Sequence, residues 1–342
     1  MKKEECFGLI DRYILFGGGP LLILTAKILK NRGIQVIVVT SHRHAKEVRR
    51  IGLKSDTLLT HLEDAKVEYV VSHNIENDAK VLRAISDTTI GLSFGAAWIF
   101  KQSFIEKFNG KLLNLHGSQL PKNRGGGGFS WRIMQGNKES AALIHKIDES
   151  VDTGDIVFCK QYSFPQDCKI PLDYQKYSDE KYVELLNVFF DKVRDLQSFD
   201  LSVQDESQSS YWPRLSTDVH GFIDWNWSAK HLERFINAFD DPYTGASTFV
   251  EDNKVRLKEC SLIYDGCEFH PFQTGIIYRK NSNGVFIAAN SSSLFVAQVL
   301  NENGNDIKSA LQVGDRFYTP SKYIETAMEY RAVYTPSGLK ES

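Results

Sequence analysis

The chain has 342 residues, of which 42% are hydrophobic and 25% charged, and its formal net charge is −2. A chain of this length can form one large domain and a smaller one, and a charge so close to zero disfavours nucleic acid or an anionic membrane as the main partner. The five cysteines are scattered without a C-x-x-C pair, which favours reduced thiols and no zinc site. No apolar run approaches the roughly 20 residues of a membrane helix, so we expect a soluble, cytoplasmic protein.

The N-terminal part begins with a β-α-β pattern. Residues 13–16 predict a short strand that ends in three glycines and a proline, and residues 21–30 predict the helix that follows. Residues 35–40 predict the next buried strand. A glycine turn in this place is typical of dinucleotide sites, but Leu22 occupies the third glycine position and disfavours NAD. We expect Gly17 instead to receive part of a substrate at the helix N-terminus.

Helical and strand patterns continue to alternate up to residue 108. Helices are predicted over residues 42–51, 76–85 and 101–108, and strands over residues 68–72 and 88–94. Such alternation is typical of a mainly parallel sheet with helices on both faces, so the predicted fold class is α/β. The small residues 95–97 after the last of these strands suit a flat ring against the backbone, and they suit simple close packing equally well.

The residues that carry chemistry follow a predicted strand over residues 111–115. Asn114 and His116 are two positions apart and therefore project to the same side of that strand. They lie at its carboxyl end, where open α/β sheets bind their ligands. For this pair alone a capped turn and an ordinary loop histidine would be the commoner explanation, but a glycine-rich loop that offers N–H groups and cations follows directly. The candidate anion ligands of that loop are Lys122, Arg124, Gly125 and Gly126.

A second polar turn lies between predicted strands over residues 141–147 and 156–158. Asp152 and Asp155 flank a Thr-Gly dipeptide there, which is a turn signal. Two aspartates in a turn are common on protein surfaces. The turn gains significance because it follows the Asn-x-His pair in this order and at this separation along the chain.

The remainder of the chain shows a different pattern. A long amphipathic helix is predicted over residues 171–198, and its apolar stripe indicates core packing. The polar segment 197–210 reads as a linker, and a helix is predicted over residues 229–239. From residue 246 to the end only short strands are predicted, as in a small antiparallel barrel or sandwich.

These motifs together resemble the signature of the folate-dependent formyltransferases, which include methionyl-tRNA, glycinamide-ribonucleotide and nucleotide-sugar formyltransferases. The resemblance is strongest over residues 93–156 and looser elsewhere. It implies a Rossmann-like, mainly parallel sheet followed by a smaller β-rich, OB-like domain. The expected parts are a catalytic domain (1–198), a linker (199–217) and a C-terminal domain (218–342). The motifs are Asn114-x-His116, Leu120-Pro121-x-x-Arg124-Gly125 and Val151-Asp152-Thr153-Gly154-Asp155-Ile156.

The resemblance implies 10-formyltetrahydrofolate as co-substrate and no metal. His116 is expected to take the proton of the attacking amine, since its ordinary pKa suits that role near pH 7. Asn114 is expected to donate a hydrogen bond to the developing alkoxide. Asp152 is expected to orient His116 and to raise its pKa. The expected folate contacts are Phe94, Gly95, Ala96, Trp98, Ile99, Ile144 and Asp148.

The expected acceptor is the amino group of a nucleotide-linked amino-dideoxy sugar used for surface polysaccharide (O-antigen), with dTDP-4-amino-4,6-dideoxyglucose favoured over the 3-amino isomer. Aromatic and cationic residues at 129–132, 211–214 and 221–225 suit a base and a pyrophosphate, and the chain is not basic. Methionyl-tRNA formyltransferase and a non-catalytic folate- or nucleotide-sugar-binding protein remain as alternatives, although an intact Asn-His-Asp set argues against the binder. A homodimer is a reasonable expectation for such a protein. The expected acceptor ligands are Gly17, Lys122, Arg124, Gly125, Gly126, Trp212, Arg214 and Tyr243, with Trp212 or Tyr243 on the base.

Overall fold

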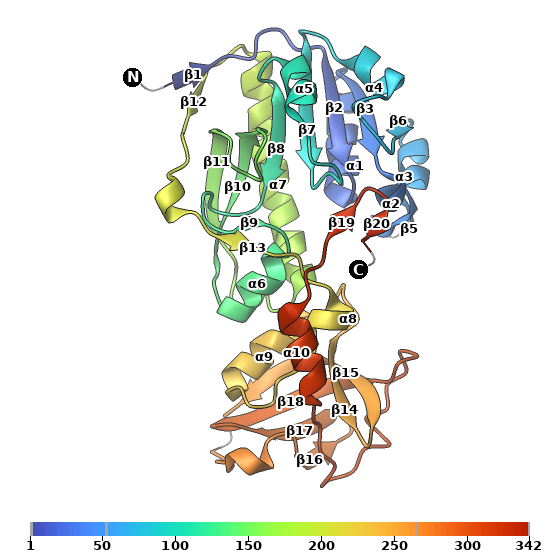
Figure 1. Cartoon of the computed structure of the whole chain (residues 1–342), viewed down its shortest axis with the longest axis vertical. Helices are drawn as coiled ribbons and strands as arrows, with labels where there is room; N and C mark the ends of the chain where they lie inside the picture. The colour runs from blue at the N-terminus through green and yellow to red at the C-terminus, as the bar shows by residue number, and fades with distance from the viewer. Residues whose placement is uncertain (1–2, 52–53, 265, 341–342) are drawn as a thin grey trace.

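The computed structural model describes residues 3–51, 54–264 and 266–340. Its N-terminal part contains a seven-stranded sheet in the order β11-β10-β8-β7-β2-β3-β6 (Figure 1). The strands from β8 to β6 run parallel, and β10 runs antiparallel to both of its neighbours. The predicted mainly parallel α/β sheet is therefore confirmed. The strands are β2 (Arg12–Gly17), β3 (Gln35–Thr40), β6 (Glu68–Val71), β7 (Thr89–Phe94), β8 (Leu112–His116), β10 (Glu139–Lys146) and β11 (Ile156–Ser163).

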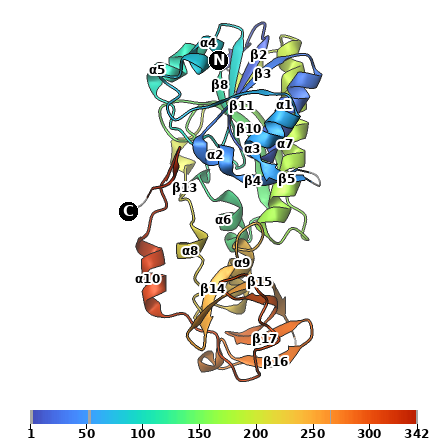
Figure 2. The same ribbon diagram turned by 90° about the vertical axis from the view of Figure 1, so that its right-hand side faces the viewer.

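Helices cover both faces of this sheet, because side chains along its inner strand β2 alternate between two cores. Tyr13 and Leu15 of β2 pack with residues of α1, α3 and α7, whereas Ile14 and Phe16 pack with residues of α4, α5 and η1. Figure 2 shows these two groups on opposite sides of the strands. The helices are α1 (Pro20–Asn31), α3 (Leu58–Asp64), α4 (Ala79–Ala84), α5 (Gln102–Ile105), η1 (Glu106–Phe108) and α7 (Pro171–Arg194).

The helix predicted over residues 42–51 is wrong in its second half. Helix α2 covers only His42–Lys46, and β4 (Val48–Ile51) then pairs with β5 (Lys54–Thr57). Val48 and Ile51 are β-branched, and such residues favour an extended backbone. Helix α4 also begins three residues later than predicted, because the Asp78 side chain caps it by accepting from the backbone N–H of Lys80 and Val81.

The segment predicted as a linker is bound to the N-terminal domain along much of its length. Within it β12 (Phe199–Leu201) pairs with β1 (Lys3–Glu5), and η2 covers Glu206–Gln208. Further on, β13 (Tyr211–Trp212) pairs in parallel with β9 (Arg124–Gly125). The sequence did not reveal β12 because only two apolar residues stand out from a polar stretch. The exact division of the chain at residues 198 and 217 stays a prediction.

The C-terminal domain is an antiparallel β-rich unit, as predicted. Its five-stranded sheet has the order β14-β15-β18-β17-β16, and α6 of the N-terminal domain packs against α9 beside it. The strands are β14 (Ala246–Val250), β15 (Asn253–Ile263), β16 (Ile277–Asn281), β17 (Gly284–Ala289) and β18 (Ser292–Leu300). The helices in and beside this domain are α8 (Thr217–His220), α9 (Ala229–Ala238) and η3 (Pro271–Gln273), and α6 of the N-terminal domain covers Gly128–Gln135.

The end of the chain returns to the N-terminal domain. Helix α10 (Ser321–Glu329) runs beside the C-terminal domain, and β19 (Tyr334–Thr335) and β20 (Gly338–Leu339) then form a hairpin next to α2 (Figures 1 and 2). The prediction of strands alone after residue 246 is wrong here, since a run of good helix formers follows Pro320. Within the described part of the chain, no helix combines the length and apolar character that a membrane span requires.

Candidate active site

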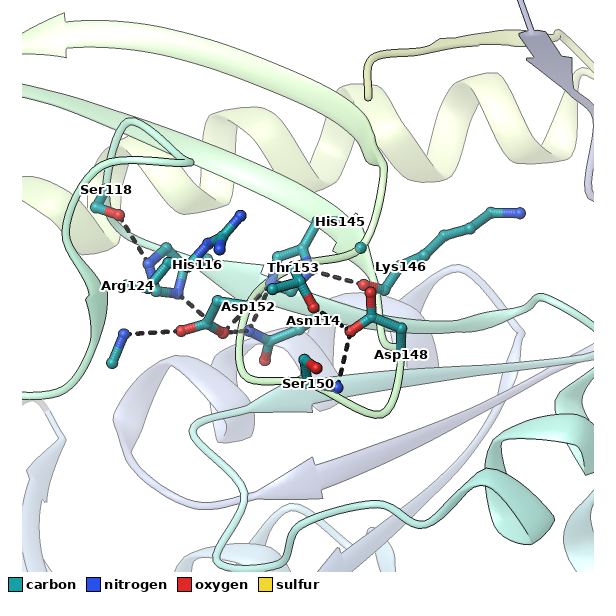
Figure 3. Close-up of polar contacts among 12 residues, drawn as sticks. Asn114, His116, Ser118, Arg124, His145, Lys146, Asp148, Ser150, Asp152 and Thr153 are labelled. Carbon is teal, nitrogen blue, oxygen red and sulfur yellow. Dashed lines mark hydrogen bonds and ion pairs between the residues drawn. The ribbon is translucent and has the colours of Figure 1, made fainter. Parts of the chain in front are cut away.

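Two strands and one turn bring the predicted catalytic residues together (Figure 3). Asn114 and His116 lie at the carboxyl end of β8 and line the same cavity, as their spacing predicted. The turn that joins β10 to β11 brings Asp152 to them. The His116 Nδ1 atom lies 3.6 Å from Asp152 Oδ1, and Asn114 Nδ2 donates to the same oxygen at 3.4 Å.

The Asp152 carboxylate is held from the side opposite the histidine as well. The backbone N–H of Gly125 donates to Asp152 Oδ2 at 3.0 Å, so the glycine-rich loop takes part in the site. Asp152 has φ 57°, a left-handed conformation that costs free energy for a residue with a side chain. The Gln204 side chain offsets part of that cost by donating to the carbonyls of Asp152 and Gly154 at 2.9 and 2.8 Å.

Both ring nitrogens of His116 have a polar neighbour. Its Nε2 lies 2.8 Å from Ser118 Oγ, which in turn lies 3.1 Å from the carbonyl oxygen of Lys122. The one hydroxyl hydrogen of Ser118 serves one of these two partners, so the contact is compatible with either tautomer of the neutral ring. Nδ1 is the ring nitrogen beside Asp152.

Burial governs the charge states of this pair. Burial lowers the pKa of His116 to about 4, although the Asp152 charge acts in the opposite direction. The expectation that Asp152 raises the pKa of His116 is confirmed in direction, but burial outweighs the carboxylate and decides the net shift. Burial also raises the pKa of Asp152, but the neighbouring rings of His145 and His116 and the backbone N–H of Gly125 outweigh burial together and bring the pKa to about 2. At neutral pH the site holds a neutral imidazole beside a carboxylate.

His145 is a site residue that the sequence analysis missed. It lies opposite Asn114 in the β8–β10 ladder and is 2% exposed. Its Nδ1 donates to the carbonyl of Lys146 at 2.7 Å, so its Nε2 is free to accept from Asn114 Nδ2 at 3.1 Å. A histidine in an otherwise apolar strand, beside a polar turn, was the available signal. The neighbouring Ile144, which was expected to contact folate, is instead fully buried in the core.

The two histidines and Asp152 also form the kind of donor set that holds a metal ion. Their ligand atoms all lie within 4.8 Å of one another. Each imidazole, however, already has a hydrogen bond to a neighbouring hydroxyl, carbonyl or amide group. The expectation that no metal takes part stays a prediction.

A cavity of about 420 Å³ opens in front of these side chains. Five of the seven expected folate residues line it, whereas Phe94 is buried behind it with Ile144. Three of the expected acceptor residues, including Arg214, line it as well. The expected residues on its wall are Gly95, Ala96, Trp98, Ile99, Asp148, Gly125, Gly126 and Arg214, and those not foreseen include Arg43, His145, Tyr211, Val333 and Tyr334.

The other expected acceptor residues have different surroundings. Arg124 is buried and its guanidinium binds Glu206 at 2.6 and 2.8 Å and Gln204 at 2.7 Å. Trp212 is buried beneath the Arg132 guanidinium, which lies 5.6 Å from its ring centroid. Tyr243 lies in a turn of the C-terminal domain, and like Trp212 it is absent from the described residues that line the cavity.

The last two expected acceptor residues, Lys122 and Gly17, are not among the residues that line the cavity. Lys122 is exposed. A Cβ on Gly17 would lie 2.3 Å from the Phe94 carbonyl oxygen, so close backbone packing is enough to require glycine there.

A second cavity of about 990 Å³ adjoins the first. The two share Tyr211, Arg214, Ala332 and Val333 as wall residues. Aromatic rings dominate its lining. They include Trp131, Phe222, Trp227 and Phe235. Arg214 thus lies at the boundary between the catalytic cavity and an aromatic one.

Comparison with known families agrees with this geometry. The family model for formyl transferase matches residues 13–172, and the model for the formyl transferase C-terminal domain matches residues 216–312. The chain belongs to the formyl transferase family and is a folate-dependent enzyme of that class. The two matches leave residues 173–215 and everything beyond residue 312 unmatched.

Among curated proteins, the chain is similar to methionyl-tRNA formyltransferases. The protein from Desulfotalea psychrophila is 30% identical over 190 residues, which cover 55% of this chain and 56% of that protein. The protein from Marinobacter nauticus is 26% identical over 319 residues, which cover 90% of this chain and 98% of that protein.

Among solved structures, the chain is similar to sugar N-formyltransferases. The sugar 3N-formyl transferase WlaRD, solved with dTDP and 5-N-formyl-THF, has a TM-score of 0.60 and 20% identity, with 86% of this chain and 99% of that one covered. The N-formyltransferase from Helicobacter canadensis, solved with folinic acid and dTDP-3-aminofucose, has a TM-score of 0.61 and 19% identity, with 85% and 100% covered. At these identities the likeness shows the shared fold.

Proposed function

We propose that this enzyme transfers the formyl group of 10-formyltetrahydrofolate to the amine of a nucleotide-linked amino-dideoxy sugar. The favoured acceptor is dTDP-4-amino-4,6-dideoxyglucose, made for surface polysaccharide. The observation that carries the proposal is the position of Arg214, an exposed cation between the Asn114–His116–Asp152 cavity and an aromatic cavity. A diphosphate needs cations, and a base needs flat apolar faces, so this order of groups suits a nucleotide sugar.

Each catalytic side chain has one role in the proposed chemistry. The neutral amine attacks the formyl carbon, and the neutral imidazole of His116 takes the proton that the nitrogen must lose. The Asp152 carboxylate, 3.6 Å away, stabilises the imidazolium that forms. When the tetrahedral intermediate collapses, the proton passes to N10 of the departing tetrahydrofolate and His116 returns to its neutral form.

Asn114 is proposed to stabilise the alkoxide of that intermediate. Both hydrogens of its amide nitrogen are engaged, one with His145 at 3.1 Å and one with Asp152 at 3.4 Å. The bond to Asp152 is the longer one, so an alkoxide can replace that partner with the smaller loss. The bond to His145 then keeps the amide oriented during the reaction.

On the folate side, small residues and a tightly bonded turn support the proposed binding of the pterin. A Cβ on Gly95 would have no atom within 4 Å, which means that this part of the wall is open. In the turn after β10, Asp148 accepts from Thr153 Oγ1 at 2.5 Å and from the Ser150 backbone at 3.2 Å. These bonds fix the shape of the wall opposite Gly95 and Ala96.

On the acceptor side, Arg214 is a better candidate phosphate ligand than Arg124. Arg124 would have to leave Glu206 first, whereas Arg214 forms no ion pair with a described carboxylate. The backbone of Gly125 and Gly126 and the exposed Lys122 are proposed as further ligands. The base is proposed to lie among the rings of the second cavity, such as Trp131 and Trp227, in preference to Trp212 or Tyr243.

Formylation of methionyl-tRNA is the second candidate, because the curated relatives in the comparison carry that name at 26–30% identity. A non-catalytic binder is the third, and the intact Asn114–His116–Asp152 set argues against it, because simple binding does not require all three side chains.

The test is to incubate the protein with 10-formyltetrahydrofolate and either dTDP-4-amino-4,6-dideoxyglucose, its 3-amino isomer, or methionyl initiator tRNA. Release of tetrahydrofolate is expected with a nucleotide sugar. Release with the tRNA alone would make the second candidate correct, and release with none of the three would favour a binder.

A further inference from the structure

The C-terminal strap, residues 330–340, crosses from the C-terminal domain to the N-terminal domain in front of the active site. It follows α10 and contains the β19–β20 hairpin (Figures 1 and 2). It lies beyond residue 312, where the family match ends, so its role does not follow from membership of the family. Its residues 332–334 nevertheless line the same cavity as Asn114 and His116.

Hydrogen bonds attach the strap at several points. Near its start, the carbonyl of Tyr330 lies 3.1 Å from His220 Nε2 of the C-terminal domain. Near its end, the carbonyl of Pro336 accepts from the backbone N–H of Arg43, on α2 of the N-terminal domain, at 3.2 Å. The Lys340 N–H donates to the carbonyl of Val333 at 2.7 Å and closes the hairpin. The strap is therefore attached to both domains.

Tyr334 lies between two arginines at the cavity wall. The Arg43 guanidinium carbon is 5.3 Å from the centroid of its ring and that of Arg214 is 5.0 Å, both within cation–π range. The aliphatic part of Arg214 is fixed as well, since a Cβ on Gly126 would lie 2.4 Å from Arg214 Cγ. Tyr334 and Gly126 together determine where the Arg214 charge is placed.

We propose that the strap is the acceptor-side wall of the active site and that Tyr334 is a specificity-determining residue. Tyr334 holds Arg214 in place for the acceptor's phosphates, and the strap restricts the cavity to acceptors of small-molecule size. This inference rests on the proposed function.

The size restriction follows from the contacts of the strap that a large acceptor would have to break. A nucleotide sugar can use the 420 Å³ cavity and its larger neighbour with the strap in place. A folded macromolecule must bring flanking backbone past the wall. It would have to displace the strap and break the Arg43–Pro336 hydrogen bond and both contacts of the Tyr334 ring. The strap thus selects against a large acceptor without contacting the reacting atoms.

The experiment compares Tyr334→Ala, Tyr334→Phe and a chain that ends at Tyr330, with dTDP-4-amino-4,6-dideoxyglucose as acceptor. Tyr334→Ala is expected to raise the acceptor KM by about 3- to 30-fold, the factor that corresponds to one or two cation–π contacts. The KM for 10-formyltetrahydrofolate should stay within about two-fold. Tyr334→Phe keeps the ring and should recover most of the lost affinity, and the shortened chain should behave like Tyr334→Ala or worse.

The matched control is Tyr264→Ala, which removes a tyrosine that is 85% exposed on the C-terminal domain and lines neither cavity. Thermal unfolding of each variant checks that the fold is intact. An unchanged acceptor KM in both Tyr334→Ala and the shortened chain would overturn the inference while leaving the proposed function standing. A wild-type protein that formylates no nucleotide sugar contradicts the proposed function itself, and efficient formylation of methionyl initiator tRNA by wild type would refute the size restriction.

Discussion

At the scale of single residues, the site depends on one neutral imidazole and one carboxylate. His116→Asn removes the group that takes the amine proton, and Asp152→Asn removes the charge that stabilises the imidazolium. Each is expected to reduce kcat by roughly 100- to 10,000-fold, as is usual when an acid–base group is lost. Rapid-quench measurement of single turnovers checks the chemical step directly. Near-normal rates in either variant would exclude that residue from proton transfer, and unchanged binding of a non-reactive folate analogue would show that the site is intact.

The low pKa of His116 also predicts how stability depends on pH. Because the folded pKa is about 4 and the unfolded one about 6.5, the unfolded chain binds more protons between these values. Stability from this group is therefore present above pH 6.5 and is lost as the pH falls towards 4. Between pH 7 and pH 5 the wild type should lose about 2 kcal/mol more than His116→Asn.

Urea unfolding at the two pH values checks this difference. Asp152 does not contribute in that range, because its pKa lies below the window in both states. Equal losses in wild type and variant would show that His116 is not buried as a neutral ring.

At the scale of elements, the turn after β7 is expected to form the wall against the flat pterin. Gly95 has φ 59° and open space where a side chain would project, so Gly95→Leu should fill that part of the cavity. The Kd of a folate analogue, measured by calorimetry, is expected to rise at least ten-fold, with a smaller change for the acceptor. Gly304→Leu is the matched control, since that glycine also has positive φ and open space but lies outside both cavities. An unchanged Kd in Gly95→Leu would rule out this position for the pterin.

On the acceptor side, the loop before α6 acts together with Arg214, whose side chain packs against Gly126. Arg214→Ala removes a charge-assisted contact of about 1.5–3 kcal/mol, so dTDP should bind roughly 10- to 100-fold more weakly. Gly126→Ala should weaken dTDP in the same direction, because the new methyl group displaces the Arg214 side chain. Gly128→Ala is the control, since a Cβ there meets no atom within 4 Å. If dTDP binds all four proteins equally, Arg214 does not hold its phosphates.

The sequence predicted the parts of the site that lie within one strand or one turn. The i, i+2 spacing placed Asn114 and His116 correctly, and the parallel strands β2, β3, β6, β7 and β8 were predicted within one residue of their ends, whereas β10 begins two residues earlier and β11 ends five residues later than predicted. It could not predict His145, because the register between β10 and β8 decides that this residue faces Asn114. It also could not predict that burial would outweigh the charge of Asp152 on the pKa of His116. The strap escaped because Tyr334 and Pro336 contact Arg43, which lies nearly 300 positions earlier in the chain.

At the scale of the whole molecule, the active site is formed by residues of both domains and of the segment between them. The strap and the 199–217 segment contribute walls to the same cavity from opposite directions along the chain. The two family matches omit the strap and residues 199–215. Tyr211, Arg214 and Tyr334, which line the cavity, therefore lie outside both matches.

The segment between the domains also supports the turn of Asp152, through the Gln204 side chain. Its two hydrogen bonds to the turn of Asp152 mean that the strained backbone of the catalytic aspartate is supported by a residue outside the parallel sheet. A fragment that stops at residue 198 would keep every catalytic side chain and lose that support. The smallest autonomous catalyst that can be cut from this chain must extend at least through Gln204, and through Arg214 if it is to recognise its acceptor. The unit of catalysis is thus longer than the N-terminal family match, which ends at residue 172.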